Sequence, residues 1–238
     1  GKEKLEYHER SVPVGNLDKK YKFEEAVQII QSVFGRLNPK FTEIFESFLD
    51  GRIDVYPKKG KDGGAFCTES YKSQHSHIML NYNNRLQDVL TLAHELGHGI
   101  HFEMMKKTQN SLNFGASMAT AEVASTFMED FVLQELSRES DDELKLAINM
   151  MKLNDDVSTI IRQVACYNLE FELHTEFRKK GFLPKKDIDD IFLKHMAAYM
   201  GDSVIQSPGS ENWWIYWSHL RYFFYVYSYA SGLLISKS

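Results

Sequence analysis

The stretch Gln87–Phe102, QDVLTLAHELGHGIHF, decides the fold, and at its centre stands His94-Glu95-Leu96-Gly97-His98. On a helix, residues four positions apart project from one face, with Cβ atoms about 5–6 Å apart. Two imidazoles so placed can reach one ion at the distance of about 2.0–2.1 Å that zinc–nitrogen bonds have. The opposite side of this helix is apolar and predicts packing on a core: Val89, Leu92, Leu96, Ile100.

Glu95 follows the first histidine directly and turns about 100° away from it, which puts its carboxylate beside an ion rather than on it. There it can take a proton from a metal-bound water. Gly97 and Gly99 each cost about 1 kcal/mol against alanine inside a helix, so we expect a close approach by a neighbouring element or a substrate. The alternative interpretation is a chance motif on a solvated helix face.

Glu122 is the best candidate for a third ligand, and it lies in Ala119–Ser125, ATAEVAS, whose small residues would let a second helix come close. The alternative, a surface acid, explains this residue poorly, because a solvated face would carry more charge around it. His101 shares the histidine face, but three side chains in a row on one helix surround an ion poorly, so we reject it. Glu129 is a candidate acceptor for the second N–H of a ligating histidine, with a plain exposed acid as the alternative.

The composition is that of a globular protein, with 43% hydrophobic and 26% charged residues and a formal net charge of -5. Without a dense Lys/Arg run, the electrostatic case for a nucleic-acid partner is missing. No apolar run is long enough to span a membrane, and Gly1–Arg10 lacks the apolar region of a signal peptide. Cys67 and Cys166 form no CxxC pair, which argues against a disulfide scaffold or a thiolate site and favours a reducing, cytoplasmic location.

Periodicity predicts a mainly α chain with one small sheet, as a single domain over residues 1–238. We expect a loosely ordered leading segment over 1–20 and a small sheet over 52–82, made of short strands at Ile53–Tyr56, Ala65–Cys67 and Ile78–Leu80. The remaining ranges have helical spacing: 22–34, 41–49, 87–106, 115–137, 141–153, 155–180, 187–200 and 211–236.

Several blocks together resemble the thimet oligopeptidase and oligoendopeptidase F family of zinc metallopeptidases. The matching residues are His94–His101, Glu122–Thr126 and His219–Gly232, which reads HLRYFFYVYSYASG, together with the glycine-containing turn Gly60–Phe66. The resemblance extends from about residue 20 to residue 235. It implies a mainly α (α+β) fold, a gluzincin-like zinc peptidase catalytic domain that is helical with a small β-sheet.

Carried over residue by residue, the resemblance implies that His94, His98 and Glu122 bind one Zn²⁺ per chain and that Glu95 is the general base. It also implies that His219, Tyr225 and Tyr229 bind substrate and the transition state. A phenol or imidazole N–H near the scissile carbonyl stabilises the developing oxyanion. Because Tyr225 and Tyr229 are four residues apart, a helix over 211–236 would point them the same way, although an aromatic core stripe is the alternative.

The expected function is zinc-dependent hydrolysis of internal bonds in short peptides. Members of the family are much longer, so the chain resembles a catalytic-domain fragment. Two rivals remain. One is a zinc carboxypeptidase, in which Arg221 would bind the free terminal carboxylate. The other is a catalytically incomplete fragment that binds peptide or metal. We expect peptide substrates, no nucleic acid and no membrane as partners.

Overall fold

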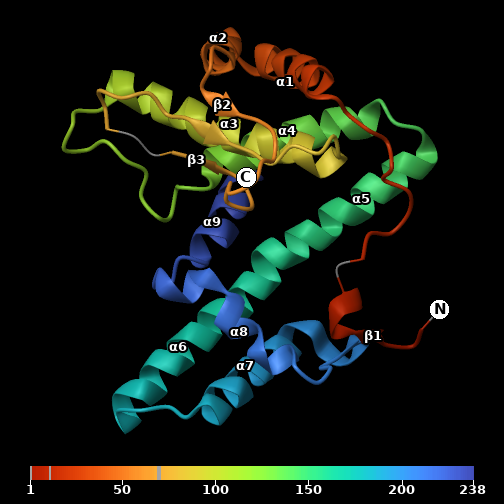
Figure 1. The fold of residues 1–238 in the computed structure, drawn as a ribbon, viewed down its shortest axis with the longest axis vertical. Helices are drawn as coiled ribbons and strands as arrows, with labels where there is room; N and C mark the ends of the chain where they lie inside the picture. Colours follow the sequence, from red (N-terminus) through yellow and green to blue (C-terminus); the bar gives the residue numbers. More distant parts are fainter. Residues whose placement is uncertain (1, 11, 69–70) are drawn as a thin grey trace. The chain divides into compact units, whose positions relative to one another are not determined.

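A computed structural model describes residues 2–10, 12–68 and 71–238 of the chain. The chain is mainly helical, with short strands only, as the sequence predicts (Figure 1). Its contacts divide it into two compact units. The first unit comprises Gly1–Val14 and Met150–Ser231, and the second comprises Gly15–Asn149 and Gly232–Ser238. No helix of the described residues is long and apolar enough to cross a membrane.

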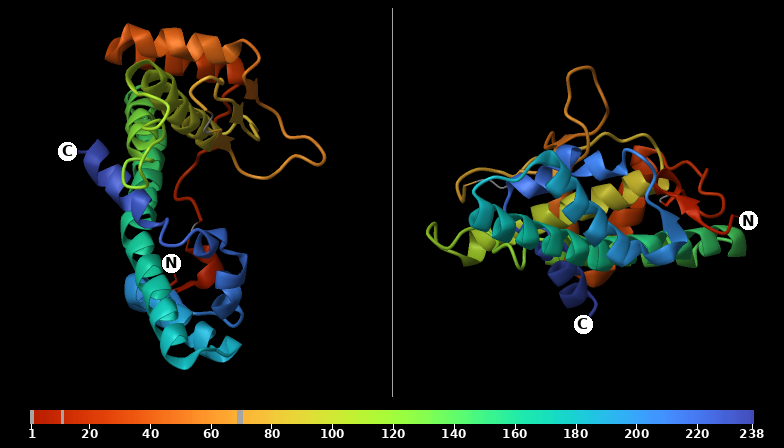
Figure 2. Two further views of the ribbon diagram at one scale, coloured as in Figure 1. Left: turned by 90° about the vertical axis from the view of Figure 1, so that its left-hand side faces the viewer. Right: turned by 90° about the horizontal axis from the view of Figure 1, so that it is seen from below.

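The second unit contains four complete helices of the described residues, together with the first half of α5 (Asp142–Val157) and the end of α9 (Tyr227–Ser236). The complete helices are α1 (Phe23–Leu37), α2 (Pro39–Leu49), α3 (Leu86–Thr108) and α4 (Val123–Arg138). In α1 and α2 the apolar residues recur at helical spacing, and their buried faces pack onto α3 and α4 (Figure 2). The core they share includes side chains that are completely or almost completely buried: Ile30, Phe34, Phe45, Phe48, Val89, Leu92, Leu96 and Val132.

A three-stranded sheet lies beside α3 in the same unit. Its strands are β2 (Ile53–Asp54), β3 (Phe66–Cys67) and β4 (Ile78–Met79), in the order β2-β4-β3. β4 is buried and pairs in parallel with β2 and antiparallel with β3, which leaves β3 at an edge. The loop between β2 and β3 extends away from the helices (Figure 2). The predicted small sheet over 52–82 is confirmed.

The first unit is built around α6 (Gln163–Lys180) and α7 (Lys185–Met200), joined through Gly181 at a positive φ of 74°. Ala165, Cys166 and Leu169 of α6 pack against Ile191, Phe192 and Met196 of α7, with Val226 completing the cluster. β1 (Leu5–Glu6) pairs in parallel with β5 (Val204–Ile205), and Tyr7 of the short helix η1 (Tyr7–Glu9) is buried. The leading segment is therefore ordered over Leu5–Glu9, because strand pairing and burial of Tyr7 hold it.

The break expected near residue 154 is absent. α5 (Asp142–Val157) continues through a π-helical turn, η2 (Ser158–Arg162), into α6. No proline or glycine interrupts this range, and a π turn absorbs one extra residue without ending a helix.

The single helix predicted over 211–236 is also wrong. The structure has η4 (Ser210–Asn212), α8 (Trp213–Tyr216), η5 (Ser218–Arg221), a non-helical segment and α9 (Tyr227–Ser236). The interruption lies at Phe223 and Phe224, whose φ angles are 45° and 60°. Local side-chain chemistry gives no sign of it, because neither residue favours the left-handed region.

Candidate metal centre

α3 carries the two histidines on the face opposite its buried apolar side. The helix begins where the Asp88 side chain accepts the backbone N–H groups of Asn83 and Arg85, both at 2.8 Å. Its apolar side is buried, as the spacing predicts. His94 and His98 lie one turn apart on the other side, with ring centroids 5.0 Å apart.

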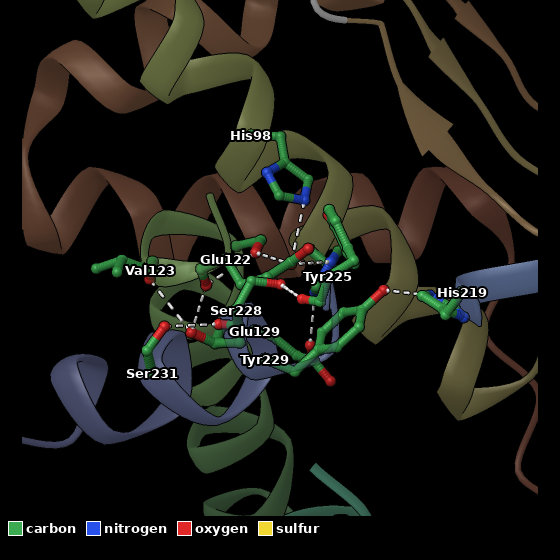
Figure 3. A network of polar contacts seen from close by, with 12 residues as sticks. His98, Glu122, Val123, Glu129, His219, Tyr225, Ser228, Tyr229 and Ser231 are labelled. Carbon is green, nitrogen blue, oxygen red and sulfur yellow. Dashed lines mark hydrogen bonds and ion pairs between the residues drawn. The ribbon is translucent and has the colours of Figure 1, made fainter. Parts of the chain in front are cut away.

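Glu122 brings a carboxylate to both imidazoles. Its Oε2 lies 3.3 Å from Nε2 of His94 and 3.4 Å from Nε2 of His98. One donor atom from each of the three side chains lies within 4.8 Å of the others, so the group could hold a metal ion. Glu122 is only 3% exposed. Figure 3 shows the His98 ring directed toward it.

The local structure around Glu122 differs from the prediction. The helix expected over 115–137 begins only at Val123, and Glu122 is its N-cap residue, with φ -95° and ψ 0°. The preceding residues form a turn in which the Thr120 N–H donates to the Ser117 carbonyl at 2.9 Å. Gly115 has φ 129°, a conformation that an L side chain rarely adopts, so a helix cannot pass through this residue.

Two glycines make room for this carboxylate. A Cβ on Gly97 would lie 2.6 Å from the Ala124 carbonyl oxygen and 2.6 Å from Ser125 Cα, so α3 and α4 approach closely at this point. A Cβ on Gly232 would lie 2.7 Å from Cβ of Glu122. The expected close approach of a neighbouring element at Gly97 is confirmed. Gly99 meets the Phe48 ring in the same way.

Glu129 and Ser125 contact the candidate ligands His94 and Glu122 and limit their orientations. His94 Nδ1 lies 3.0 Å from Glu129 Oε2, which directs the other ring nitrogen, Nε2, toward Glu122. This contact matches the acceptor role predicted for Glu129. Ser125 Oγ lies 3.0 Å from Glu122 Oε2 and is completely buried, and sequence reasoning missed it. Its position three residues after a candidate ligand is the one sequence signal that could have identified it.

The ionisation of Glu122 is coupled to that of His94. Burial by itself would lower the pKa of His94, but its contacts with Glu122 and Glu129 outweigh burial and raise that pKa to about 10. Burial would raise the pKa of Glu122, yet the two imidazoles hold it well below its ordinary value. A buried, ionised carboxylate together with two imidazoles forms a donor set suited to zinc. A metal ion would replace the proton that His94 otherwise retains.

Glu95 lies next to the donor group and is 6% exposed. Burial raises its pKa, and the nearby Glu122 charge adds to that effect. The two histidines and the backbone N–H of Cys67, on the edge strand β3, act in the opposite direction. Burial also raises the pKa of the Cys67 thiol to about 12, so this thiol stays protonated at neutral pH.

His219, Tyr225 and Tyr229 form a cluster within the first unit. His219 Nε2 lies 2.9 Å from the Tyr229 hydroxyl (Figure 3). The ring centroids of Tyr225 and Tyr229 are 5.5 Å apart, and that of Tyr225 is 5.8 Å from that of His219. The three predicted side chains are brought together, but not by a common helix, because Tyr225 precedes α9.

Two residues weighed in the sequence lie elsewhere. His101 is outside the donor group that the described residues form, and its ring stacks on Phe102 at a centroid distance of 6.2 Å. Burial lowers its pKa. Arg221 donates to the carbonyl oxygens of Trp217 and Ile215, both at 3.3 Å.

Comparisons with known proteins come from sequence and from structure. The model of Peptidase family M3 matches residues 2–238. Oligoendopeptidase F (chromosomal) of Lactococcus lactis subsp. cremoris is 29% identical over 222 residues, which are 92% of this chain and 37% of the relative. Oligopeptidase PepF of Bacillus subtilis strain 168 is 29% identical over 215 residues, 90% of this chain and 32% of the relative. The chain thus spans less than half the length of these relatives.

Solved structures share the fold. PZ peptidase A with an inhibitor superposes with a TM-score of 0.78 at 18% identity, covering 99% of this chain and 42% of that one. Oligoendopeptidase F from Enterococcus faecium superposes with a TM-score of 0.62 at 21% identity, covering 99% and 35%. At these identities the likeness concerns the fold alone.

Proposed function

Because this chain belongs to peptidase family M3, we propose that His94, His98 and Glu122 bind one zinc ion and that the chain carries the catalytic centre of an endopeptidase for short peptides. The observation that supports this most is the donor group itself, with one atom from each side chain within 4.8 Å of the others. The relatives named oligoendopeptidase F support internal bonds as the target.

The metal would supply a Lewis acid and a water molecule whose pKa lies near 7. Glu95 accepts the proton of the attacking water and later delivers it to the leaving amine. Burial raises its pKa, the direction that favours both roles, because a base that must also act as an acid works best with a pKa near the operating pH. The Cys67 N–H orients the carboxylate of Glu95 while it does so.

We assign the binding of substrate and of the developing oxyanion to His219, Tyr225 and Tyr229. Hydroxyl and imidazole donors stabilise the tetrahedral oxygen more than the planar carbonyl. The contact between His219 and Tyr229 limits the orientations of both donors before substrate binds. The exposed edge at β3 offers backbone groups with which an extended peptide could pair.

Substitution of the base tests this proposal. Glu95→Gln keeps the shape but cannot accept the proton, so we expect full zinc binding and hydrolysis of a quenched fluorescent peptide reduced by several orders of magnitude. Zinc content is measured by metal analysis of the purified variant. Turnover like that of the wild type would eliminate Glu95 as the base.

A second assay separates an endopeptidase from a carboxypeptidase. We expect chelator-sensitive cleavage of a peptide blocked by C-terminal amidation, at a rate similar to that of the free acid. Cleavage of the free acid alone, one residue at a time, would instead support a carboxypeptidase. Zinc binding without any cleavage would support a binding fragment.

A further inference from the structure

The segment Tyr222–Val226, between η5 and α9, has a backbone that its own residues do not favour. Phe223 and Phe224 have φ angles of 45° and 60°, two successive bulky residues in the left-handed region. Each such residue strains the backbone and persists only where the surroundings impose it. Tyr225 comes next, so the direction of its side chain depends on these two torsion angles. Something outside the segment must hold it.

Glu170 of α6 supplies the main contact. Its Oε1 accepts the backbone N–H of Phe224 at 2.7 Å, and the residue is 1% exposed. A carboxylate oxygen can accept a backbone N–H directly. This single bond therefore acts at the strained position itself, one residue before Tyr225.

Other side chains of α6 pack on the two phenylalanines. The His174 ring packs on Phe223 and Phe224 at centroid distances of 5.9 and 5.5 Å, and its Nε2 lies 3.5 Å from Glu170 Oε1. Tyr167 packs on Phe224 at 5.1 Å. On the other side of Tyr225, Val226 is completely buried in the core of this unit. The segment is held at both ends of Tyr225.

Glu170 is a poor choice for stability alone. Its Oε2 is buried and has no hydrogen-bond partner among the residues that the structure describes. A buried acceptor without a partner destabilises the fold, and an apolar side chain in this place would avoid that loss. What an apolar side chain could not do is accept the N–H of Phe224.

We propose that Glu170 is a positioning residue that holds Phe223 and Phe224 in the left-handed conformation and thereby aims Tyr225 within the cluster with His219 and Tyr229. This inference rests on the proposed function, in which that cluster binds the oxyanion. Glu170 acts through the segment, while Tyr225 touches the substrate.

The test compares Glu170→Ala and Glu170→Gln in the zinc-loaded protein. Misplacing a donor by about 1 Å costs up to about 100-fold in rate, so we expect Glu170→Ala to lower kcat by about 10- to 100-fold, with KM and zinc content unchanged. Glu170→Gln keeps a carbonyl oxygen for the Phe224 N–H and should recover kcat to within about threefold of the wild type.

Glu172→Ala is the matched control. It removes a carboxylate from the same helix, whose partners are Lys194 at 2.7 Å and His195 at 2.6 Å rather than the aromatic segment. We expect its kcat to equal that of the wild type. A kcat that falls equally in Glu170→Ala and Glu172→Ala, or that is unchanged in Glu170→Ala, would overturn the proposal.

Hydrogen exchange and a second variant test the role of Glu170 independently of hydrolysis and of the folding of Glu170→Ala. Amide hydrogen exchange, which needs neither zinc nor substrate, should be faster over Phe224–Ser228 in Glu170→Ala and unchanged in Glu172→Ala. This result stands even if the wild type hydrolyses no peptide, an outcome that removes the proposed function alone. If Glu170→Ala does not fold, His174→Ala replaces it, because that side chain is 37% exposed. We then expect kcat to be lower by about threefold to tenfold. A wild-type kcat would contradict the role of α6 in holding Phe223 and Phe224.

Discussion

Glu129 shows how much one hydrogen bond behind a metal ligand can decide. Its Oε2 lies 3.0 Å from His94 Nδ1, so the contact fixes the orientation of the His94 ring before any ion arrives and leaves Nε2 for the ion. Partners of this kind raise the basicity of the ligand, and their loss typically costs 10- to 100-fold in metal affinity.

We therefore expect Glu129→Ala to weaken zinc binding by about 10- to 100-fold, measured by competition with a chromophoric chelator. Glu135→Gln is the control on the same helix, because Glu135 pairs with Arg36 and Arg138 instead. Equal zinc affinities in Glu129→Ala and the wild type would show that Glu129 does not contribute to zinc binding.

At the scale of elements, the approach of α3 to α4 depends on Gly97. A Cβ there would lie 2.6 Å from backbone atoms of Ala124 and Ser125, and backbone cannot move aside as a flexible side chain can. Alanine would favour the helix itself by about 1 kcal/mol, but forcing two packed helices apart costs about 1–3 kcal/mol or more.

Gly97→Ala should therefore lower the free energy of unfolding and weaken zinc binding, since Glu122 moves with α4. Urea unfolding and a zinc titration measure the two effects. Gly63→Ala serves as control, because a Cβ there has open space around it. If Gly97→Ala proved as stable as the wild type and bound zinc as tightly, the helices would have to be further apart than described.

A second link between elements is the ion pair of Arg52 and Glu103, at 2.6 Å. Arg52 follows α2 and also donates to the Ser76 carbonyl at 2.9 Å, so it joins α2, the sheet and α3. Burial would raise the pKa of Glu103, but Lys106 and Arg52 outweigh it and hold that pKa below the ordinary value of 4.5. The ionised form is thus the one that the fold stabilises.

A folded-state pKa below the unfolded one means that the stabilisation is complete above pH 4.5 and is lost as the pH falls through the folded value. We expect Glu103→Gln to cost about 1–2 kcal/mol at pH 7 and progressively less below about pH 4. Urea unfolding at several pH values measures this difference, with the exposed Glu46→Gln as control. A cost that did not change with pH would assign the effect to packing.

At the scale of the whole molecule, an ion that binds only the folded chain must stabilise it. Zinc at about 100 times its dissociation constant adds about 2.7 kcal/mol. For a chain of this length, each kcal/mol shifts Tm by roughly 2–4 °C, so a rise of about 5–10 °C is expected.

Scanning calorimetry with zinc and with chelator measures that rise, and His94→Ala should abolish it. Hydrogen exchange should place the added protection mainly on α3 and α4, which carry the donor side chains. An equal Tm with zinc and with chelator would contradict a metal site in this chain.

The sequence by itself determined the features that arise from short-range geometry. Helical spacing placed His94 and His98 on one face, because positions i and i+4 meet on any helix. The mainly helical class and the small sheet over 52–82 followed from periodicity and turn residues, and Glu129 could be nominated from its spacing on α4. His219, Tyr225 and Tyr229 came from the resemblance rather than from spacing.

Only the tertiary structure decided the features that depend on distant residues. The room that Gly232 leaves for Glu122 and the bond from Phe224 to Glu170 each join residues far apart in the chain, and no local pattern encodes such pairs. The helix predicted over 211–236 failed for the same reason. Phe223 and Phe224 have no intrinsic preference for a positive φ, and the contacts with α6 that hold them there form only once the chain has folded.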